Sequence, residues 1–157
     1  MKRIYAIEAW CLDCKRCEVA CKTAHSASKN TVKAYKLEGD VPQSRIRVEG
    51  GKFASIAVNC RHCASPRCVM GCISGVMRKD PSTGLVVSDP EKCVGCRTCV
   101  SMCPFGAVHV EEVCDVVAKG YAYKCDLCGS QLGQPGEPSC VKACPNRALI
   151  YVESEVC

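Results

Sequence analysis

The chain has 157 residues, a formal net charge of +5 and eighteen cysteines, more than one residue in nine. That share exceeds the roughly 8–10% above which disulfide bonds or bound metal organise a short chain. Aromatic residues make up only 5% of the sequence, so large apolar side chains for a conventional core are scarce. These numbers exclude a plain hydrophobic domain and indicate a fold organised by its sulfur atoms.

A disulfide-rich protein needs an oxidising compartment. Only four uncharged residues separate Arg3 from Glu8, too few for the apolar segment of a secretory signal, and no twin-arginine pair occurs. The longest apolar stretch, 68–77, falls well short of the ~20 residues that a membrane helix requires. We therefore expect a reduced, cytoplasmic protein without direct membrane insertion.

One cysteine unit repeats four times along the chain. The copies are Cys11-x2-Cys14-x2-Cys17-x3-Cys21, Cys60-x2-Cys63-x4-Cys68-x3-Cys72, Cys93-x2-Cys96-x2-Cys99-x3-Cys103 and Cys125-x2-Cys128-x11-Cys140-x3-Cys144. The last two cysteines of each copy are about one helical turn apart, which predicts a short helix beginning there. A proline follows the third and fourth copies, but Lys22 and Ile73 follow the first two.

The segments between the copies predict strands and loops. After the polar stretch 26–36, the sequence predicts a hairpin with strands at 44–48 and 52–58, and Gly50-Gly51 suits a two-residue turn between them. Two further strands are predicted at 107–110 and 148–152. The insertion in the fourth copy, 129–139, contains three glycines and two prolines and is typical of a surface loop.

The cysteine spacing indicates iron–sulfur chemistry. A Cys-x2-Cys-x2-Cys loop holds three iron atoms of a cubane [4Fe-4S] cluster, and in the bacterial two-cluster pattern the fourth cysteine binds the neighbouring cluster. Such sharing requires an even number of copies. Zinc is the main alternative, because Cys-x2-Cys pairs also build tetrahedral zinc sites. Zinc sites usually separate two pairs by a dozen or more residues, whereas the first and third copies place three cysteines within seven positions.

The four cysteine groups, their order, the wider gap in the second copy and the long insertion in the fourth resemble a known family. Its members are the four-cluster, ferredoxin-like electron-transfer subunits of anaerobic oxidoreductases, such as dimethyl sulfoxide reductase, formate dehydrogenase and formate hydrogenlyase. The N-terminal segments 2–5, 17–18, 25–26 and 33–36 look closest to the subunits that serve carbon monoxide dehydrogenase and tungsten-dependent aldehyde oxidoreductase.

The resemblance covers nearly the whole chain and implies an α+β, ferredoxin-like fold. Two pseudosymmetric dicluster units would be nested, each with short helices and small antiparallel strands. The outer unit would comprise residues 1–45 and 113–157, and the inner unit residues 46–112.

The resemblance also implies how the cysteines are shared among four [4Fe-4S] clusters. The outer pair of clusters would be held by Cys11, Cys14, Cys17 and Cys144, and by Cys125, Cys128, Cys140 and Cys21. The inner pair would be held by Cys60, Cys63, Cys68 and Cys103, and by Cys93, Cys96, Cys99 and Cys72. An oxidised cluster with its ligands carries about −2, so the net charge of the loaded chain would fall to about −3.

The expected function is low-potential electron transfer without catalysis, since the sequence contains no recognisable motif for a nicotinamide, flavin or pterin. The expected partner is a nickel carbon monoxide dehydrogenase or a tungsten aldehyde oxidoreductase, and formate dehydrogenase or hydrogenase is a less favoured one. A flavin-containing subunit or a ferredoxin would accept the electrons. A free polyferredoxin serving several enzymes and a zinc-binding interaction module remain alternatives, and no nucleic-acid partner is expected.

Three residues lie beside this pattern. Cys114 and Cys157 fall outside the repeat, where each is either a labile or redox-active thiol or an ordinary residue. His62 lies inside a cysteine loop, where it would either hydrogen-bond to a cluster sulfur or simply pack.

Overall fold

The computed structural model describes residues 2–38, 43–110, 120–129 and 136–153. Within these ranges the chain has the expected α+β fold, built from short elements. The helices are η1 (Glu8–Trp10), α1 (Arg16–His25), α2 (Thr31–Leu37), α3 (Arg67–Met70), α4 (Thr98–Ser101) and α5 (Ser139–Ala143). The strands are β1 (Lys2–Ala6), β2 (Ile46–Gly50), β3 (Ser55–Asn59), β4 (Met77–Lys79), β5 (Val86–Ser88), β6 (Val108–Val110), β7 (Ala122–Lys124) and β8 (Leu149–Glu153).

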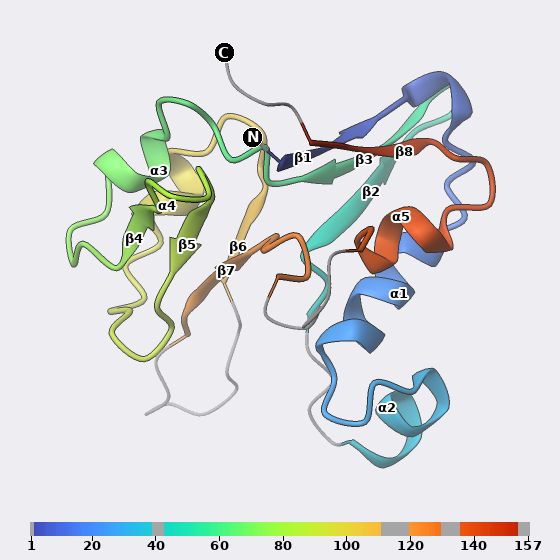
Figure 1. Ribbon diagram of the computed structural model, residues 1–157, viewed down its shortest axis with the longest axis horizontal. Helices are drawn as coiled ribbons and strands as arrows, with labels where there is room; N and C mark the ends of the chain where they lie inside the picture. The colour runs from blue at the N-terminus through green and yellow to red at the C-terminus, as the bar shows by residue number, and fades with distance from the viewer. Residues whose placement is uncertain (1, 39–42, 111–119, 130–135, 154–157) are drawn as a thin grey trace.

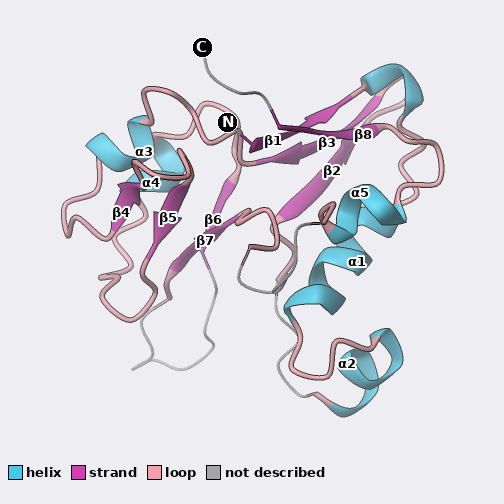
Figure 2. Ribbon diagram, viewed as in Figure 1, coloured by secondary structure: helices cyan, strands magenta, loops and turns pink. Residues whose placement is uncertain are grey.

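The elements gather into two lobes (Figure 1). One lobe joins both ends of the chain and contains β1, β8, β2, β3, α1 and α5, with α2 at its edge. The other contains α3, α4 and the strand pairs β4–β5 and β6–β7. Helices and loops make up much of each lobe, and the strands form two-stranded antiparallel pairs within the described ranges (Figure 2). Short pairs of this kind have little stability alone and depend on what packs against them.

The strand pair β1–β8 joins the two ends of the chain. Its register runs from Lys2 opposite Glu153 to Ala6 opposite Leu149, and the Lys2 ammonium lies 2.7 Å from the Glu153 carboxylate. This closure places Cys144, just before β8, beside the first cysteine loop, since both line one hollow on the surface.

The hairpin β2–β3 forms as predicted, but its turn is longer than the two residues expected. Gly50 still belongs to β2 and lies opposite Ser55, and the Gly51 N–H donates to the Ala54 carbonyl at 2.9 Å. A Cβ at Gly50 would lie 2.9 Å from a carboxylate oxygen of Asp13. The absence of a side chain at Gly50 therefore allows β2 to pack closely against the first cysteine loop. The turn begins one residue later, at Gly51.

The helices predicted at the cysteines are confirmed. Each of α1, α3, α4 and α5 begins one residue before the third cysteine of its copy. Helix α1 runs one turn beyond Cys21, where Lys22 replaces the proline of the later copies, whereas α4 and α5 end before Cys103 and Cys144. The strands predicted at 107–110 and 148–152 are present as β6 and β8.

Helix α2 was not predicted, because its segment is polar. The Asn30 side chain accepts a hydrogen bond from the Lys33 N–H at 3.1 Å, which is a helix N-cap. Ala34 on this helix is fully buried. The asparagine before a run of helix-forming residues was the available signal.

The four cysteine loops share one backbone feature. The residue before the second cysteine has a positive φ in every copy: Asp13 at 52°, His62 at 46°, Gly95 at 70° and Leu127 at 55°. The left-handed conformation costs a non-glycine residue about 1–2 kcal/mol. Such residues persist only where the surroundings impose them, and they gather at functional sites. The repeat in the sequence is therefore also a repeat of backbone conformation.

The nested division into outer and inner units stays a prediction. Two contacts cross the boundaries expected between these units. The hairpin β2–β3 packs on α1 and β1. Strand β7, near the C-terminal part of the chain, pairs with β6 in the lobe of α3 and α4. Most of the loop expected at 129–139 lies outside the described residues.

We expect the N-cap hydrogen bond of Asn30 to stabilise helix α2. Replacing Asn30 with alanine removes the acceptor for the Lys33 N–H and should cost about 1 kcal/mol. Amide hydrogen exchange along α2 should become faster, whereas Asn30→Asp, which keeps an acceptor oxygen, should retain slow exchange. Equal exchange in the alanine and aspartate variants would contradict this role.

Two glycines have the same backbone conformation, but we expect their replacement by alanine to reduce stability by different amounts. Gly95 and Gly75 have φ of 70° and 67°, but a Cβ at Gly95 would lie 2.7 Å from the Gly120 carbonyl oxygen, whereas one at Gly75 meets nothing within 4 Å. Gly75→Ala should cost only the left-handed strain of about 1–2 kcal/mol. Gly95→Ala should add roughly 1–3 kcal/mol of overpacking. Thermal unfolding midpoints should therefore fall further for Gly95→Ala, and equal midpoints would refute the close contact with Gly120.

Candidate iron-sulfur centres

The structure brings thiols of different copies together, because negative charge at one cysteine raises the pKa of others, and the predicted ligand sets divide them into four groups. We number them group 1 (Cys11, Cys14, Cys17, Cys144), group 2 (Cys21, Cys125, Cys128, Cys140), group 3 (Cys60, Cys63, Cys68, Cys103) and group 4 (Cys72, Cys93, Cys96, Cys99). Each group contains the last cysteine of a different copy from its other three members.

Groups 1 and 2 lie in the lobe of α1 and α5. Burial raises the pKa of Cys17 to about 12, and repulsion from Cys14 and Cys144 adds to the rise. Cys11 lines the same surface hollow as these three. Burial also raises the pKa of Cys140, with further repulsion from four thiols: Cys125, Cys21, Cys128 and Cys17. The packing of α1 on α5 is what brings these copies together.

Groups 3 and 4 follow the same arrangement around α3 and α4. Burial raises the pKa of Cys60, and Cys103 and Cys63 add repulsion. Burial likewise raises the pKa of Cys68 to about 11, with repulsion from Cys60 and Cys103. Burial also raises the pKa of Cys99, and negative charge at Cys93, Cys72 and Cys96 adds to the rise. The contact between α3 and α4 places the end of each helix near the loop of the other copy.

Exposure differs among the groups. All four cysteines of group 2 are buried, whereas Cys14 of group 1 and Cys96 of group 4 are the exposed ones among the sixteen. Burying a thiolate without a nearby cation is costly, which is why burial raises these pKa values. The buried sulfurs are therefore suited to binding iron, since bound metal ions stabilise the deprotonated form.

The last cysteine of every copy accepts a backbone N–H at its sulfur. In the third and fourth copies the donor lies four residues on: Ala107 to Cys103 at 3.4 Å and Ala148 to Cys144 at 3.2 Å. In the second copy, which lacks the proline, Met77 donates to Cys72 at 3.5 Å. Hydrogen bonds to cluster sulfurs are one of the factors that set reduction potential.

The first copy obtains this hydrogen bond from a distant segment. Because α1 continues past Cys21, the following backbone N–H groups are used within the helix. The Arg45 N–H, 24 residues further along the chain, donates to the Cys21 sulfur at 3.3 Å instead. The first copy thus has the same type of contact as the others, although its local sequence differs.

His62 provides an independent test of whether the loops fit a cluster. The side chain is fully buried, and its Nδ1 accepts the Val86 N–H at 3.1 Å, which leaves the proton on Nε2. That Nε2 is buried and has no hydrogen-bond partner among the described residues. Burial lowers the pKa of His62 to about 3, so the ring is neutral. An unpaired buried donor between Cys60 and Cys63 fits a site whose sulfur acceptors belong to a bound cluster.

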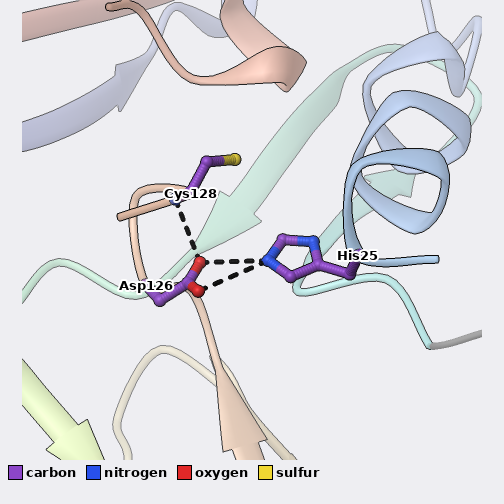
Figure 3. A group of neighbouring side chains, drawn as sticks. All are labelled: His25, Asp126 and Cys128. Atoms are coloured by element: carbon purple, nitrogen blue, oxygen red, sulfur yellow. Dashed lines mark hydrogen bonds and ion pairs between the residues drawn. The ribbon is translucent and has the colours of Figure 1, made fainter. Parts of the chain in front are cut away.

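A polar network joins the two sides of group 2. The His25 Nε2 lies 3.1 Å from the Asp126 carboxylate, which also accepts the Cys128 N–H at 3.0 Å (Figure 3). The Arg45 guanidinium lies 2.6 Å from the other carboxylate oxygen. Burial alone would lower the pKa of His25, but its bonds to Asp126 and Cys21 raise it to about 10.

This network links α1 to the loop of the fourth copy. His25, Asp126 and Cys128 are close enough to hold a metal ion, but the Arg45 guanidinium already neutralises the carboxylate. We therefore interpret the network as a structural link that fixes the Cys125–Cys128 loop against α1. Nothing local in the sequence pairs His25 with Asp126, which is 101 residues away.

Two of the cysteines considered above, Cys114 and Cys157, lie outside the described residues. Over the described ranges, no helix has both the length and the apolar character needed to cross a membrane.

Comparison with known proteins identifies the family. Residues 52–154 match the family described as 4Fe-4S dicluster domain. An "Iron-sulfur protein" of Rhodospirillum rubrum is 35% identical over 96% of this chain and 81% of its own length. The electron transport protein HydN of Escherichia coli is 35% identical over 96% of this chain and 87% of its own length. A subunit of the anaerobic dimethyl sulfoxide reductase of Escherichia coli is 36% identical over 90% of this chain and 68% of its own length.

These relatives carry names of iron–sulfur, electron-transport or oxidoreductase proteins, and the matched family binds [4Fe-4S] clusters, so the zinc alternative is set aside. The recurring loops, the grouped thiols and the unpaired His62 nitrogen agree with that cofactor. The chain belongs to the 4Fe-4S dicluster family of iron–sulfur electron-transfer subunits, and its cofactors are [4Fe-4S] clusters.

Proposed function

We propose that this chain holds four [4Fe-4S] clusters, one in each cysteine group, and conducts electrons between a catalytic oxidoreductase subunit and an electron acceptor without catalysing a reaction itself. When bound, each cluster takes up and releases one electron between its 2+ and 1+ states. The observation that carries the proposal is the grouping of the thiols, because each group draws its fourth sulfur from another copy of the repeat.

The order of the groups supports a linear path. Negative charge at Cys17 of group 1 would raise the pKa of Cys140 of group 2, so these groups are neighbours. Negative charge at Cys60 of group 3 would likewise raise the pKa of Cys125 of group 2. Groups 3 and 4 share the packed helices α3 and α4. Groups 1 and 4 are then the ends of the path.

The exposed sulfurs support the same assignment of the ends. Cys14 belongs to group 1 and Cys96 to group 4. Exposed apolar side chains lie near each of them in sequence: Trp10 and Leu12 before Cys14, and Val94 and Met102 around Cys96. Electron exchange with another protein requires a cluster near the surface, so partners would dock at these two ends.

The chain contributes spacing, exclusion of water and hydrogen bonds to sulfur. Group 2 lies in a buried setting, and its Cys21 accepts a backbone N–H. In group 4 the Thr98 hydroxyl donates to the Cys96 sulfur at 3.4 Å, and this bond lowers the pKa of Cys96. Bonds of this kind stabilise negative charge at sulfur and so favour the reduced cluster.

For the partner we propose a carbon monoxide dehydrogenase or a tungsten aldehyde oxidoreductase, on the N-terminal resemblance, with a ferredoxin or a flavin-containing subunit as acceptor. The similarity to a subunit of an anaerobic dimethyl sulfoxide reductase supports membership of a multisubunit complex. We place the protein in the cytoplasm, where reducing conditions keep cysteine ligands available. A free polyferredoxin is the second candidate, favoured by a sulfur exposed at each end.

Anaerobic affinity purification from the native organism separates these candidates. A large subunit that carries nickel would identify the dehydrogenase, and one that carries tungsten the aldehyde oxidoreductase. Recovery of the loaded chain alone, with several enzymes able to reduce it, would support the polyferredoxin. A colourless chain without iron would overturn electron transfer altogether.

The shared ligation predicts different iron losses for two double variants. Replacing Cys14 and Cys144 with alanine removes two ligands of group 1 and should release about four iron atoms, the content of one cluster. Replacing Cys128 and Cys144 removes a ligand from each of groups 1 and 2 and should release about eight. Iron and sulfide analysis of the anaerobically purified proteins measures both.

The control is Cys114→Ala, which should leave the iron content unchanged because Cys114 stands outside the repeat. If each copy held a cluster by itself, the pattern would reverse. The variant at Cys128 and Cys144 would then release about four iron atoms, and the variant at Cys14 and Cys144 about eight.

A further inference from the structure

Lys124 is the buried charged residue that the proposed electron path does not yet explain. Its side chain lies at the end of β7, directly before Cys125, and the residue is only 4% exposed. The Nζ donates to the Val86 carbonyl oxygen and to the Cys125 carbonyl oxygen. Among the described residues, no carboxylate forms an ion pair with this ammonium group.

A buried ammonium group without a counter-charge is costly. Asp126 is near in sequence, but its carboxylate is held by the Arg45 guanidinium at 2.6 Å and by His25 at 3.1 Å. Two carbonyl oxygens satisfy hydrogen bonds of Lys124 but do not neutralise its charge. Among the described residues, the negative charge available near Lys124 beyond the paired Asp126 is that of the cysteine sulfurs when they bind iron.

Lys124 lies between groups 2 and 3. Its backbone continues into Cys125 of group 2. Its Nζ reaches the cysteine loop of group 3, because it donates to the carbonyl of Val86, whose N–H donates to His62 between Cys60 and Cys63. Negative charge at Cys60 would raise the pKa of Cys125, so the two groups are neighbours.

The backbone of Val86 fixes the position of this charge. The Val86 N–H donates to His62 Nδ1, and the Val86 carbonyl accepts from Lys124 Nζ. A single residue of strand β5, Val86, therefore binds both the Lys124 side chain and the His62 ring. Strand β5 belongs to the lobe that contains group 3. Neither contact is formed by neighbours in sequence, since they span 24 and 38 residues.

We propose that the Lys124 ammonium group is the shared counter-charge of the two central clusters, in groups 2 and 3, and raises the reduction potentials of both. This inference rests on the proposed four-cluster path. An electron added to either cluster adds negative charge next to a fixed positive charge, which stabilises the reduced state. An electron passed between the lobes would oxidise one central cluster from 1+ to 2+ and reduce the other from 2+ to 1+, so no further reductant would be needed.

The test compares the full-length chain, purified anaerobically with its clusters, with Lys124→Gln and Lys124→Arg. Glutamine removes the charge but keeps an N–H donor, and arginine keeps the charge. The matched control is Lys92→Gln, because the Lys92 side chain is 76% exposed. Redox titration followed by electron paramagnetic resonance gives the potential of each cluster, and iron analysis gives the number of clusters.

We expect Lys124→Gln to decrease the one-electron reduction equilibrium constant of two clusters by roughly tenfold, about 59 mV each, and to leave the other two unchanged. Lys124→Arg and Lys92→Gln should titrate like the wild type. Unchanged potentials in a fully loaded Lys124→Gln protein, or an equal shift of all four, would overturn the inference but leave the four-cluster proposal intact. Fewer than four clusters in the wild type would instead refute the proposed function.

Poor assembly also gives a decisive outcome. If Lys124→Gln and Lys124→Met both lose about half of the iron and Lys124→Arg retains it, the positive charge is required at this position, as proposed. If Lys124→Arg loses the same clusters, the shape of lysine is needed and its charge is not, and the inference is wrong.

Discussion

The structure depends on burying sulfur atoms that must carry negative charge. Seven of the sixteen cysteines in the repeat are buried, and few large apolar side chains are available to replace them in the core. Burial by itself disfavours the thiolate, which is why the pKa of Cys17 and Cys68 rises so far. A thiol whose pKa is raised this far stays protonated, whereas bound iron deprotonates its cysteine ligands. Cluster binding should therefore be coupled to the stability of this interior.

The same type of hydrogen bond is formed at equivalent cysteines of the four copies, but its donor comes from different parts of the chain. Every last cysteine of a copy accepts a backbone N–H, yet the donor lies four residues on at Ala107 and 24 residues on at Arg45. Where proline ends the helix, the chain turns back and the donor is local. Where α1 continues to His25, the donor comes from the segment before β2. The electrostatic requirement of the sulfur is thus met by different local sequences.

Two charged residues next to the cysteines of group 2, Lys124 and Asp126, make contacts that the cysteine repeat does not predict. Asp126 is enclosed by His25 and Arg45 and fixes the fourth loop on α1. Lys124, two residues earlier, has carbonyl partners instead, one of them Val86 in the other lobe. A cation and an anion so close in sequence therefore have different partners, and the roles proposed for them differ accordingly. In the proposed path an electron crosses at the contact between the lobes, so a charge fixed there would act on the two clusters between which it passes.

The sequence by itself determined the helices at the cysteines, because a four-residue step between thiols is about one helical turn. Its cysteine spacing favoured iron–sulfur clusters over zinc, and its resemblance to a known family implied the α+β fold. It also predicted β6 and β8, which are rich in β-branched and other apolar residues. Helix α2 was missed because its cap is a single asparagine, and the turn after β2 was placed one residue early because Gly50 is needed for contact with Asp13. Only the tertiary structure decided which groups surround the sulfurs. His25 and Asp126 meet across 101 residues, and Lys124 meets Val86 across 38. Such contacts follow from how the lobes pack, and the spacing of residues along the chain does not encode them.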